Sequence, residues 1–200
     1  MKITHGQKKT RDLISEVFIE LMKKKGFAKV TVREIIEHAG INRSTFYAYY
    51  LDKYDVLDKV EDRLLSGVRD IERDAPLQVD TWSQPEANST SNTERFIRYM
   101  YDNGDLFVLF ALDKSSGPAF IEKSNGRVRA VWNELNLIDK LSVPHCYAVA
   151  AVVGMANTLI IEWVKNSFRE TPEEFLSIFT KFMQNVLPSI FDNMPMALND

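Results

Sequence analysis

Apolar residues recur at helical spacing along most of the chain. In the first strongly patterned stretch they fall three or four positions apart, on one face of a helix: Leu13, Ile14, Val17, Phe18, Leu21 and Met22. We find no alternating apolar and polar segments joined by a glycine-containing hairpin turn, the pattern that indicates paired strands. The periodicity therefore predicts an all-α protein of about nine helices.

Capping signals mark the ends of the first helices. Gly26 follows a run of three lysines and is suited to end the first helix. Residues 31–34, Thr-Val-Arg-Glu, have the spacing of a capping box at the start of the second. The turn at 39–42, Ala-Gly-Ile-Asn, leads to a short third helix that Asn42 or Ser44 can cap. Two short helices joined in this way form a helix-turn-helix.

The rest of the chain divides into a long fourth helix, a polar stretch and a second set of helices. Asp52 is placed to cap the fourth helix, which Pro76 ends. Residues 74–92 are rich in Asn, Ser, Thr and Pro and predict a long loop. Two domains are expected, a three-helix helix-turn-helix domain at 1–54 and a second helical domain at 55–200. The further helices are predicted at 93–103, 105–113, 118–136, 143–167 and 172–191.

Charge is distributed unevenly between these two domains. The net charge is -3, but residues 1–54 carry +5 and residues 55–200 carry -8. A basic head on an acidic body is typical of a protein whose one end meets phosphates. The basic residues Lys2, Lys8, Lys9 and Arg11 can track a DNA backbone or enter its minor groove, although we expect this start to be solvated and disordered.

Other features of composition favour a cytoplasmic protein. Cys146 is the only cysteine, which excludes an internal disulfide. The longest apolar run, at 146–156, is shorter than the roughly 18 to 20 residues of a membrane span. The amino terminus has basic residues but no apolar stretch of the kind found in secretory signals. We therefore expect no membrane association.

Residues that could carry catalysis are sparse. None of the three histidines, His5, His38 and His145, has a metal-ligand spacing such as H-E-x-x-H, and no phosphate-binding or nucleophile-elbow motif occurs. His145 and Cys146 are adjacent, but consecutive helical positions do not face each other, so we interpret them as structural, with Cys146 buried. We predict no catalytic residue, no metal site and no cofactor. An enzyme and a purely structural helical adaptor are the less favoured alternatives.

The most informative motif, TVREIIEHAGINRSTFYAYYLDKYDVL, spans residues 31–57. Its capping box, its Ala-Gly-Ile-Asn turn, the Ser-Thr-Phe-Tyr-Ala-Tyr-Tyr stretch at 44–50 and Lys53 together resemble the TetR family of bacterial one-component regulators. The resemblance implies a DNA-binding head followed by an all-helical ligand-binding and dimerisation domain. Ser44 and Ile36 depart mildly from the family, which often has Gly and Ala at these positions.

The resemblance also indicates which residues contact DNA. Arg43 lies at the start of the recognition helix, where an arginine can pair bidentately with guanine. Arg33 is implied to touch a base or a phosphate, and the family pattern places hydroxyl donors and one lysine on phosphates. Tyr50 is expected to point inward. The expected DNA contacts are Arg33, Arg43, Ser44, Thr45, Tyr47, Tyr49 and Lys53.

A second resemblance concerns the carboxy-terminal half. The segments at 99–110 and 146–183 resemble a Firmicutes-type, DhaS-like subgroup of the TetR family, with matching points at 161–165 and 171–174. The family as a whole implies a sequence-specific regulator, by default a repressor released from a palindromic double-stranded DNA operator by a small molecule. The subgroup implies an alternative, an activator or partner-dependent co-activator.

The last two predicted helices have more apolar surface than one small domain can cover. The helix at 143–167 is apolar nearly all round its first four turns, and the helix at 172–191 carries two apolar stripes. The resemblance implies a homodimer in which these eighth and ninth helices of two subunits form a four-helix interface. The alternative is that both stripes close on the core of one subunit. The residues expected at the interface are Ala151, Gly154, Phe179 and Phe182.

Aromatic residues are concentrated between Phe96 and Trp132. Aromatic stripes at helical spacing more often indicate plain core than a ligand site, so core packing is the main alternative. The family keeps its pocket between helices 4 and 8, and few charges occur in this stretch, so we expect a mostly apolar effector rather than a phosphate or a metal. The expected lining residues are Tyr99, Phe107, Phe110, Trp132 and Cys146.

Overall fold

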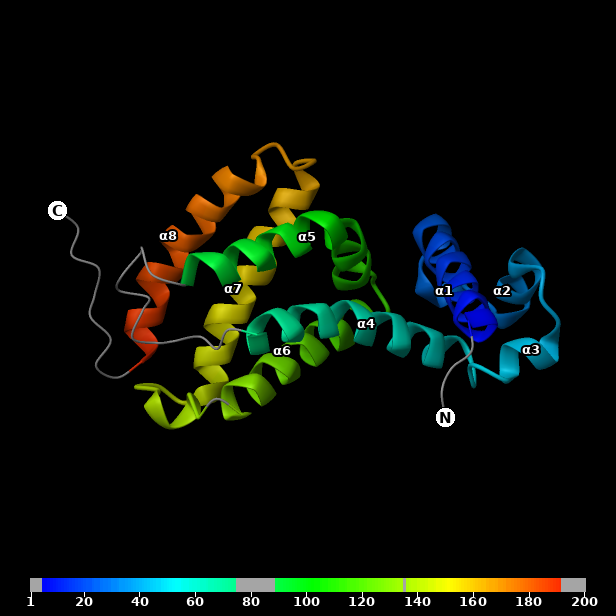
Figure 1. Cartoon of the computed structure of the whole chain (residues 1–200), viewed down its shortest axis with the longest axis horizontal. Coiled ribbons are helices and arrows are strands. Elements are labelled where there is room, and N and C mark those ends of the chain that lie inside the picture. The colour runs from blue at the N-terminus through cyan, green and yellow to red at the C-terminus, as the bar shows by residue number, and fades with distance from the viewer. Residues whose placement is uncertain (1–4, 75–88, 135, 192–200) are drawn as a thin grey trace. The chain divides into compact units, whose positions relative to one another are not determined.

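The computed structural model of the chain describes residues 5–74, 89–134 and 136–191. Within these ranges the regular structure is helical, apart from an isolated bridge between Leu141 and Phe191 (Figure 1). The all-α prediction is confirmed, with eight α-helices in the described ranges where about nine were expected. They are α1 (His5–Lys25), α2 (Val32–Ala39), α3 (Arg43–Tyr47), α4 (Lys53–Asp74), α5 (Ser89–Leu112), α6 (Gly117–Glu134), α7 (His145–Lys165) and α8 (Pro172–Ile190), with short 3-10 helices η1 (Phe27–Lys29) and η3 (Ile138–Lys140).

The chain forms two compact units. Unit 1 comprises Met1–Leu64 and Leu109–Phe120, and unit 2 comprises Leu65–Val108 and Ile121–Asp200. Helices α4, α5 and α6 each contribute residues to both units. The domain boundary predicted after residue 54 lies at the start of α4, whereas unit 1 extends further along this helix and takes in the α5–α6 loop.

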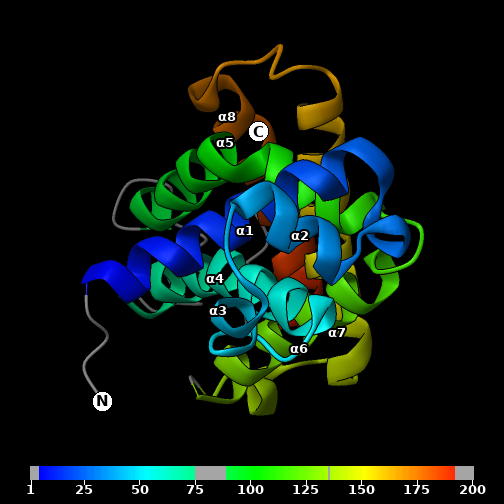
Figure 2. The same cartoon turned by 90° about the vertical axis from the view of Figure 1, so that its right-hand side faces the viewer.

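Local signals set the helices of unit 1 as predicted (Figure 2). Helix α1 ends before Gly26, which has φ 77°, and α2 ends before Gly40, which has φ 60°. Thr31 and Glu34 form the predicted capping box of α2. Of the two candidate caps of α3, Asn42 is the one used, because its side chain accepts a hydrogen bond from the backbone N–H of Thr45.

Apolar side chains from all four helices fill unit 1. Phe18 of α1, Ile35 of α2, Phe46 of α3 and Val56 of α4 are fully buried. Tyr50 is also buried, and its hydroxyl lies 3.2 Å from Ser15 Oγ of α1, which satisfies both polar groups. The inward orientation expected for Tyr50 is therefore confirmed, and the aromatic stretch at 44–50 is split between core and surface.

The α5–α6 loop belongs to unit 1 through the carboxylate of Asp113. Its Oδ2 accepts a hydrogen bond of 2.9 Å from the backbone N–H of Phe27, and its Oδ1 accepts from the backbone N–H groups of Ser115 and Ser116. Although partial burial opposes ionisation, these hydrogen bonds hold the pKa of Asp113 well below its usual range. This carboxylate, named here the Asp113 clasp, joins the 3-10 helix η1 to a loop 86 residues further along the chain.

Helix α5 differs from two predictions made from the sequence. The expected break near Gly104 does not occur, and the predicted helices at 93–103 and 105–113 form one helix. A Cβ atom at Gly104 would lie 2.7 Å from Val164 Cγ2, so the glycine permits close approach of α5 to α7 and does not end a helix. Asp74 and residues 89–92, predicted as loop, are helical, and the remainder of that predicted loop falls at 75–88, outside the described residues.

Unit 2 is organised around an aromatic cluster where α8 runs back alongside α7 (Figure 1). The Trp163 indole stacks on the Phe175 ring with centroids 4.0 Å apart, and its Nε1–H donates to the Glu170 carbonyl at 2.9 Å. Phe168 packs edge-on against Trp163 and adopts φ 52°, a conformation that costs energy for a bulky residue. Pro172 then opens α8 at the predicted position.

Candidate functional site

The recognition helix α3 is held at its amino end by one side chain. Asn42 Oδ1 accepts hydrogen bonds from the Thr45 backbone N–H at 2.7 Å, from Thr45 Oγ1 at 2.8 Å and from Ser44 Oγ at 2.7 Å. Both hydroxyls predicted to contact DNA therefore donate to Asn42 in this structure. They retain acceptor capacity, and would have to rotate to donate to a phosphate.

Arg43, the first residue of α3, is exposed. Its guanidinium carbon lies 5.6 Å from the centroid of the Tyr47 ring, which is itself exposed. Stacking on the ring limits the rotamers of the arginine without using its hydrogen-bond donors. The side chain is thus available for planar, bidentate pairing with a partner outside the chain.

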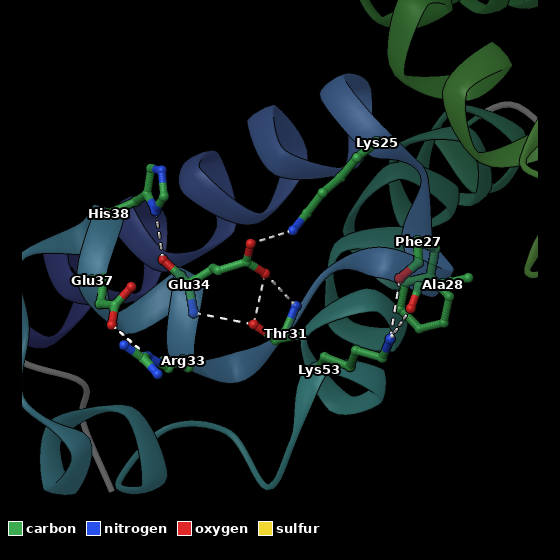
Figure 3. Close-up of polar contacts among 9 residues, drawn as sticks. All are labelled: Lys25, Phe27, Ala28, Thr31, Arg33, Glu34, Glu37, His38 and Lys53. Carbon is green, nitrogen blue, oxygen red and sulfur yellow. Dashed lines mark hydrogen bonds and ion pairs between the residues drawn. The ribbon is translucent and has the colours of Figure 1, made fainter.

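Arg33 lies on the solvent side of α2 (Figure 3). Its side chain is 86% exposed, and its Nε donates to Glu37 Oε1 at 2.7 Å, one turn further along the helix. This hydrogen bond raises the pKa of Arg33. An exposed pair of this kind contributes little to stability, so its rearrangement on binding DNA costs little.

The amino-terminal basic residues differ from expectation. Lys8, Lys9 and Arg11 are part of α1, which begins at His5, so the expected disordered start is wrong for these residues; Lys2 lies outside the described residues. The Arg11 guanidinium carbon lies 5.7 Å from the centroid of the Tyr49 ring. Arg11 of α1 thus contacts Tyr49, a residue predicted to bind a phosphate. The spacing of the two residues in the sequence does not reveal this contact.

Lys53 has a structural role that the sequence did not indicate (Figure 3). Its Nζ donates to the carbonyl oxygens of Phe27 at 3.1 Å and Ala28 at 3.0 Å, and lies 4.6 Å from the centroid of the Phe27 ring. An ammonium group has three donors, so these two bonds leave one for a phosphate. The predicted phosphate contact stays a prediction, and Lys53 in addition joins α4 to η1.

The carboxyl group of Glu34 on α2 has a strongly lowered pKa (Figure 3). A hydrogen bond from Lys25, followed by one from Thr31, lowers the pKa of Glu34 to about 2. Because the folded pKa lies below the ordinary value of 4.5, the capping interaction is fully present above pH 4.5 and is lost as the pH falls toward 2.

We expect Lys25→Met to move the pKa of Glu34 back toward 4.5 in a carbon-13 NMR titration of the carboxyl group. Lys24→Met is the matched control, and an equal shift in both variants would contradict this account.

A cavity of about 160 Å³ lies within unit 2. Of the five predicted lining residues, Phe107 and Trp132 lie on its wall. Three do not: the Tyr99 ring fills the space beside Gly67, Phe110 is buried against Phe120 in unit 1, and Cys146 is exposed on the first turn of α7, contrary to its expected burial. The sequence located the aromatic region but could not separate core positions from cavity positions.

Polar residues on the cavity wall were missed. Arg69 of α4, Ser124 and Arg127 of α6, and Asn157 of α7 all line the cavity. Asn157 is 8% exposed and its Nδ2 has no hydrogen-bond partner. In the sequence these residues have no feature that sets them apart from other polar positions, and only their place on the cavity wall distinguishes them.

The outer face of α7 and α8 contains three of the four predicted interface residues. Ala151, Gly154 and Phe182 are exposed, with 47% of Phe182 accessible. Phe179 is 4% exposed in the single chain and lies on the cavity wall, so it offers little surface to a second copy. Phe179 shares one face of α8 with Phe175 and Met183, which lie one turn before it and one turn after it. That face points toward the core of unit 2. Tyr147, 70% exposed on the same helix as Gly154, was not predicted.

Helix α7 is long and apolar enough to cross a membrane, by length and composition alone. Its most apolar 18-residue window has a mean hydropathy of 1.6, and 33% of that window is buried. A core helix in a soluble protein passes the same test. Among the described residues, no group of three or more His, Cys, Asp or Glu side chains is arranged to hold a metal ion.

Comparison with known proteins finds similarity in the amino-terminal part of the chain. Residues 14–60 match the model of bacterial regulatory proteins of the tetR family. Over 68 residues the chain is 29% identical to the uncharacterized HTH-type transcriptional regulator YxbF of Bacillus subtilis (strain 168). The match covers 34% of this chain and 18% of that relative, so the chain spans only a small part of its length. The matched residues include the motif at 31–57, so the helix-turn-helix assigned from that motif is similar to the one in tetR-family regulators.

Solved structures extend the comparison to the whole fold. A TetR-family regulator from Syntrophomonas wolfei superposes with a TM-score of 0.70 and 17% identity, covering 90% of this chain and 96% of that one. FadR from Bacillus subtilis, solved in complex with stearoyl-CoA, gives 0.59 and 13%, covering 89% and 98%. The dihydroxyacetone kinase operon activator DhaS gives 0.52 and 16%, covering 92% and 98%. At these identities the comparisons show a shared fold and do not single out the DhaS-like subgroup.

Proposed function

We propose that this chain is a ligand-responsive transcriptional regulator of the TetR type. Two copies bind a palindromic DNA operator through α3, and a small molecule bound in unit 2 releases them. The observation that carries the proposal is the tetR-family match of residues 14–60, with Arg43 exposed at the first position of the recognition helix. In a helix-turn-helix the first residues of the second helix contact base edges in the major groove.

The surface around Arg43 supports a division between residues that recognise bases and residues that position the protein on phosphates. Arg43 is the candidate for base recognition, because a guanidinium can pair with two acceptors of guanine. Arg33 and Tyr47 are also exposed, and their guanidinium and hydroxyl groups are suited to phosphates. Lys53 adds an ammonium group at the amino end of α4, where the helix dipole also favours an anion.

Helix α4 provides the connection between DNA and ligand. It begins at Lys53 in unit 1, and its residues Leu65, Val68 and Arg69 line the cavity of unit 2. A ligand that favours one position of α4 over another shifts the equilibrium between DNA-bound and released states by its difference in affinity for the two. The stearoyl-CoA bound to the FadR neighbour supports a ligand site in this fold.

Dimerisation through α7 and α8 is supported by their exposed apolar face. Gly154 and Ala151 lie on α7 and Phe182 lies on α8, and all three are exposed in the single chain. Small residues on a helix permit a second helix to approach closely, and an exposed aromatic ring supplies area for burial. The face therefore fits a second copy of the same two helices, related by a two-fold axis.

Arg43→Lys tests base recognition while preserving charge. We expect the variant to bind its operator, selected beforehand from a random DNA pool, about 10- to 100-fold more weakly, because lysine cannot reproduce the bidentate pairing. Binding to random DNA and its salt dependence should stay unchanged, since the number of neutralised phosphates is the same. Fluorescence anisotropy at several salt concentrations measures both.

Tyr47→Phe is the matched control on the same helix face. It keeps the ring beneath Arg43 but removes a hydroxyl, so it should weaken binding to operator and random DNA by the same factor. Wild-type protein that fails to prefer any selected sequence over random DNA would overturn the proposed function. A reporter gene downstream of the operator, with and without the protein, then distinguishes repression from activation.

A further inference from the structure

We propose that the cavity of unit 2 binds a neutral, largely apolar molecule with one hydrogen-bond acceptor, such as a ketone oxygen, and that the side-chain amide of Asn157 donates to this acceptor. The inference deepens the proposed function, on which it rests, by giving the chemical class of the effector. It adds one specific polar contact to the mostly apolar effector expected from the sequence.

Asn157 is the polar group on which the inference depends. It lies near the middle of α7, on the same face as Val153 and Ile160, and all three line the cavity. The residue is 8% exposed, and its Nδ2 has no hydrogen-bond partner in the described part of the chain. A buried amide donor without an acceptor lowers stability. Its place on this wall therefore favours a ligand that brings an oxygen atom to it.

The arginines of the wall do not require a charged ligand. Arg69 pairs with Asp70, with 3.9 Å between Nε and Oδ1, and its side chain is 38% exposed, so water also reaches it. Arg127 already interacts with another group of the chain. A carboxylate or a phosphate in the cavity would lose its hydration without gaining an unpaired cation, which is costly. The wall therefore favours a neutral ligand.

The other polar groups favour an acceptor on the ligand over a donor. Among the described residues that line the cavity there is no Asp or Glu, so no carboxylate repels the negative end of a carbonyl dipole. Thr93 already has an interaction within the chain. Ser124 is 7% exposed, and its hydroxyl can donate as well as accept. A carbonyl oxygen can accept two hydrogen bonds, and Asn157 supplies one of them.

The remainder of the wall limits what else the ligand can contain. Phe96, Phe107 and Trp132 contribute aromatic surface, and Met100 and Leu187 contribute aliphatic surface. The cavity volume of about 160 Å³ is close to that of an engineered apolar cavity that accepts a benzene ring. A single aromatic ring with a small carbonyl substituent matches this space and polarity.

The test compares two neutral probes of the same shape. Acetophenone has a carbonyl oxygen where α-methylstyrene has a methylene group, and calorimetric titration of the full-length protein measures the dissociation constant of each. Asn157→Leu removes the amide donor and keeps the approximate size of the side chain. We expect this variant to bind acetophenone about 10-fold more weakly than wild type, and α-methylstyrene within about 2-fold of wild type.

Asn103→Leu is the matched control, because Asn103 of α5 does not line the cavity and its Nδ2 already donates to the Tyr99 carbonyl at 2.9 Å. It should leave the affinities for both probes unchanged. Asn157→Leu removes an unsatisfied buried donor, so it should unfold at the same temperature as wild type or a higher one. A variant too unstable to fold would show that the Asn157 amide is bonded within the protein, and would overturn the inference.

The infrared spectrum of the bound ketone provides a measurement that needs no variant. A hydrogen bond to the carbonyl oxygen lowers its stretching frequency. Carbon-13-labelled acetophenone bound to the wild-type protein should therefore absorb at a lower frequency than the same ketone in hexane. Absorption at the hexane frequency would overturn the proposed hydrogen bond.

Three results of the titrations would also overturn the ligand class. They are an equal loss of affinity for both probes in Asn157→Leu, an equal loss of acetophenone affinity in both asparagine variants, and tighter binding of benzoate than of acetophenone to wild type. Operator binding without ligand, measured in the same preparations, tests the proposed function separately. A protein that prefers its operator but gives one of these three results would refute only the effector class.

Discussion

Gly154→Arg is expected to convert the protein from a dimer to a folded monomer. An added Cβ at Gly154 meets no heavy atom within 4 Å, so the single chain accepts the larger side chain without a clash. In the proposed dimer the guanidinium would be buried at the interface without a partner, at a cost of several kcal/mol. We expect the dimer dissociation constant to rise by about 1,000-fold or more, since every 1.4 kcal/mol is about a factor of ten. Sedimentation equilibrium measures this constant.

The same variant should lose most of its operator affinity. A dimer engages two half-sites, and the second contact is intramolecular, which multiplies the affinity by about 100 to 10,000 relative to one head. Gly126→Arg is the control, since Gly126 of α6 also has open space around an added Cβ. We expect this control to remain dimeric and to bind its operator. A Gly154→Arg protein with the wild-type dissociation constant would place the interface elsewhere.

Trp163→Ala is expected to produce the largest loss of stability of any substitution considered. The indole is 2% exposed, stacks on Phe175, and donates a hydrogen bond to the carbonyl of Glu170. Truncation to alanine removes the stack, leaves the partly buried Glu170 carbonyl without its donor and opens a cavity between α7 and α8, with a total cost of about 3 to 5 kcal/mol. Urea unfolding followed by circular dichroism measures the change in free energy of unfolding.

Trp163→Phe separates the contribution of the ring stacking from that of the hydrogen bond. Phenylalanine can keep most of the stacking against Phe175 but cannot donate to Glu170, so the cost should fall to about 1 to 3 kcal/mol. A Trp163→Ala cost below that of Trp163→Phe would contradict the packing described for this cluster.

Local chemistry explains which parts of the fold could be predicted. The capping box at Thr31 and the left-handed position at Gly26 depend on residues within a few positions, and both occur as expected. Gly104 carries the same local signal for a break, yet α5 continues through it because its missing side chain makes room for Val164. A glycine that ends a helix and one that allows two helices to approach look alike until the neighbouring helix is known.

The candidate sites show the same limit. Both apolar stripes of α8 were recognised, but periodicity could not say that Phe179 faces the cavity and Phe182 the solvent. Asn157 and Arg69 gave no signal, because a polar residue on a helix usually faces water, and their place on the cavity wall depends on helices distant in sequence. Lys53 was recognised by its family position, whereas its bonds to the carbonyls of η1 follow only from the fold.

The Asp113 clasp has a consequence for recombination of this domain with others. Because residues 109–120 belong to unit 1, this unit is not a continuous segment that one crossover within α4 can transfer. A hybrid that joined this head to a foreign effector domain at Leu64 would leave the backbone N–H of Phe27 without its carboxylate and would remove the buried Phe110 and Phe120. Exchange of heads between such regulators therefore requires the α5–α6 loop to move with the helix-turn-helix, or to be already compatible with it. Under the proposed function, this requirement ties the evolution of DNA specificity to residues 109–120, a short segment in the second half of the sequence.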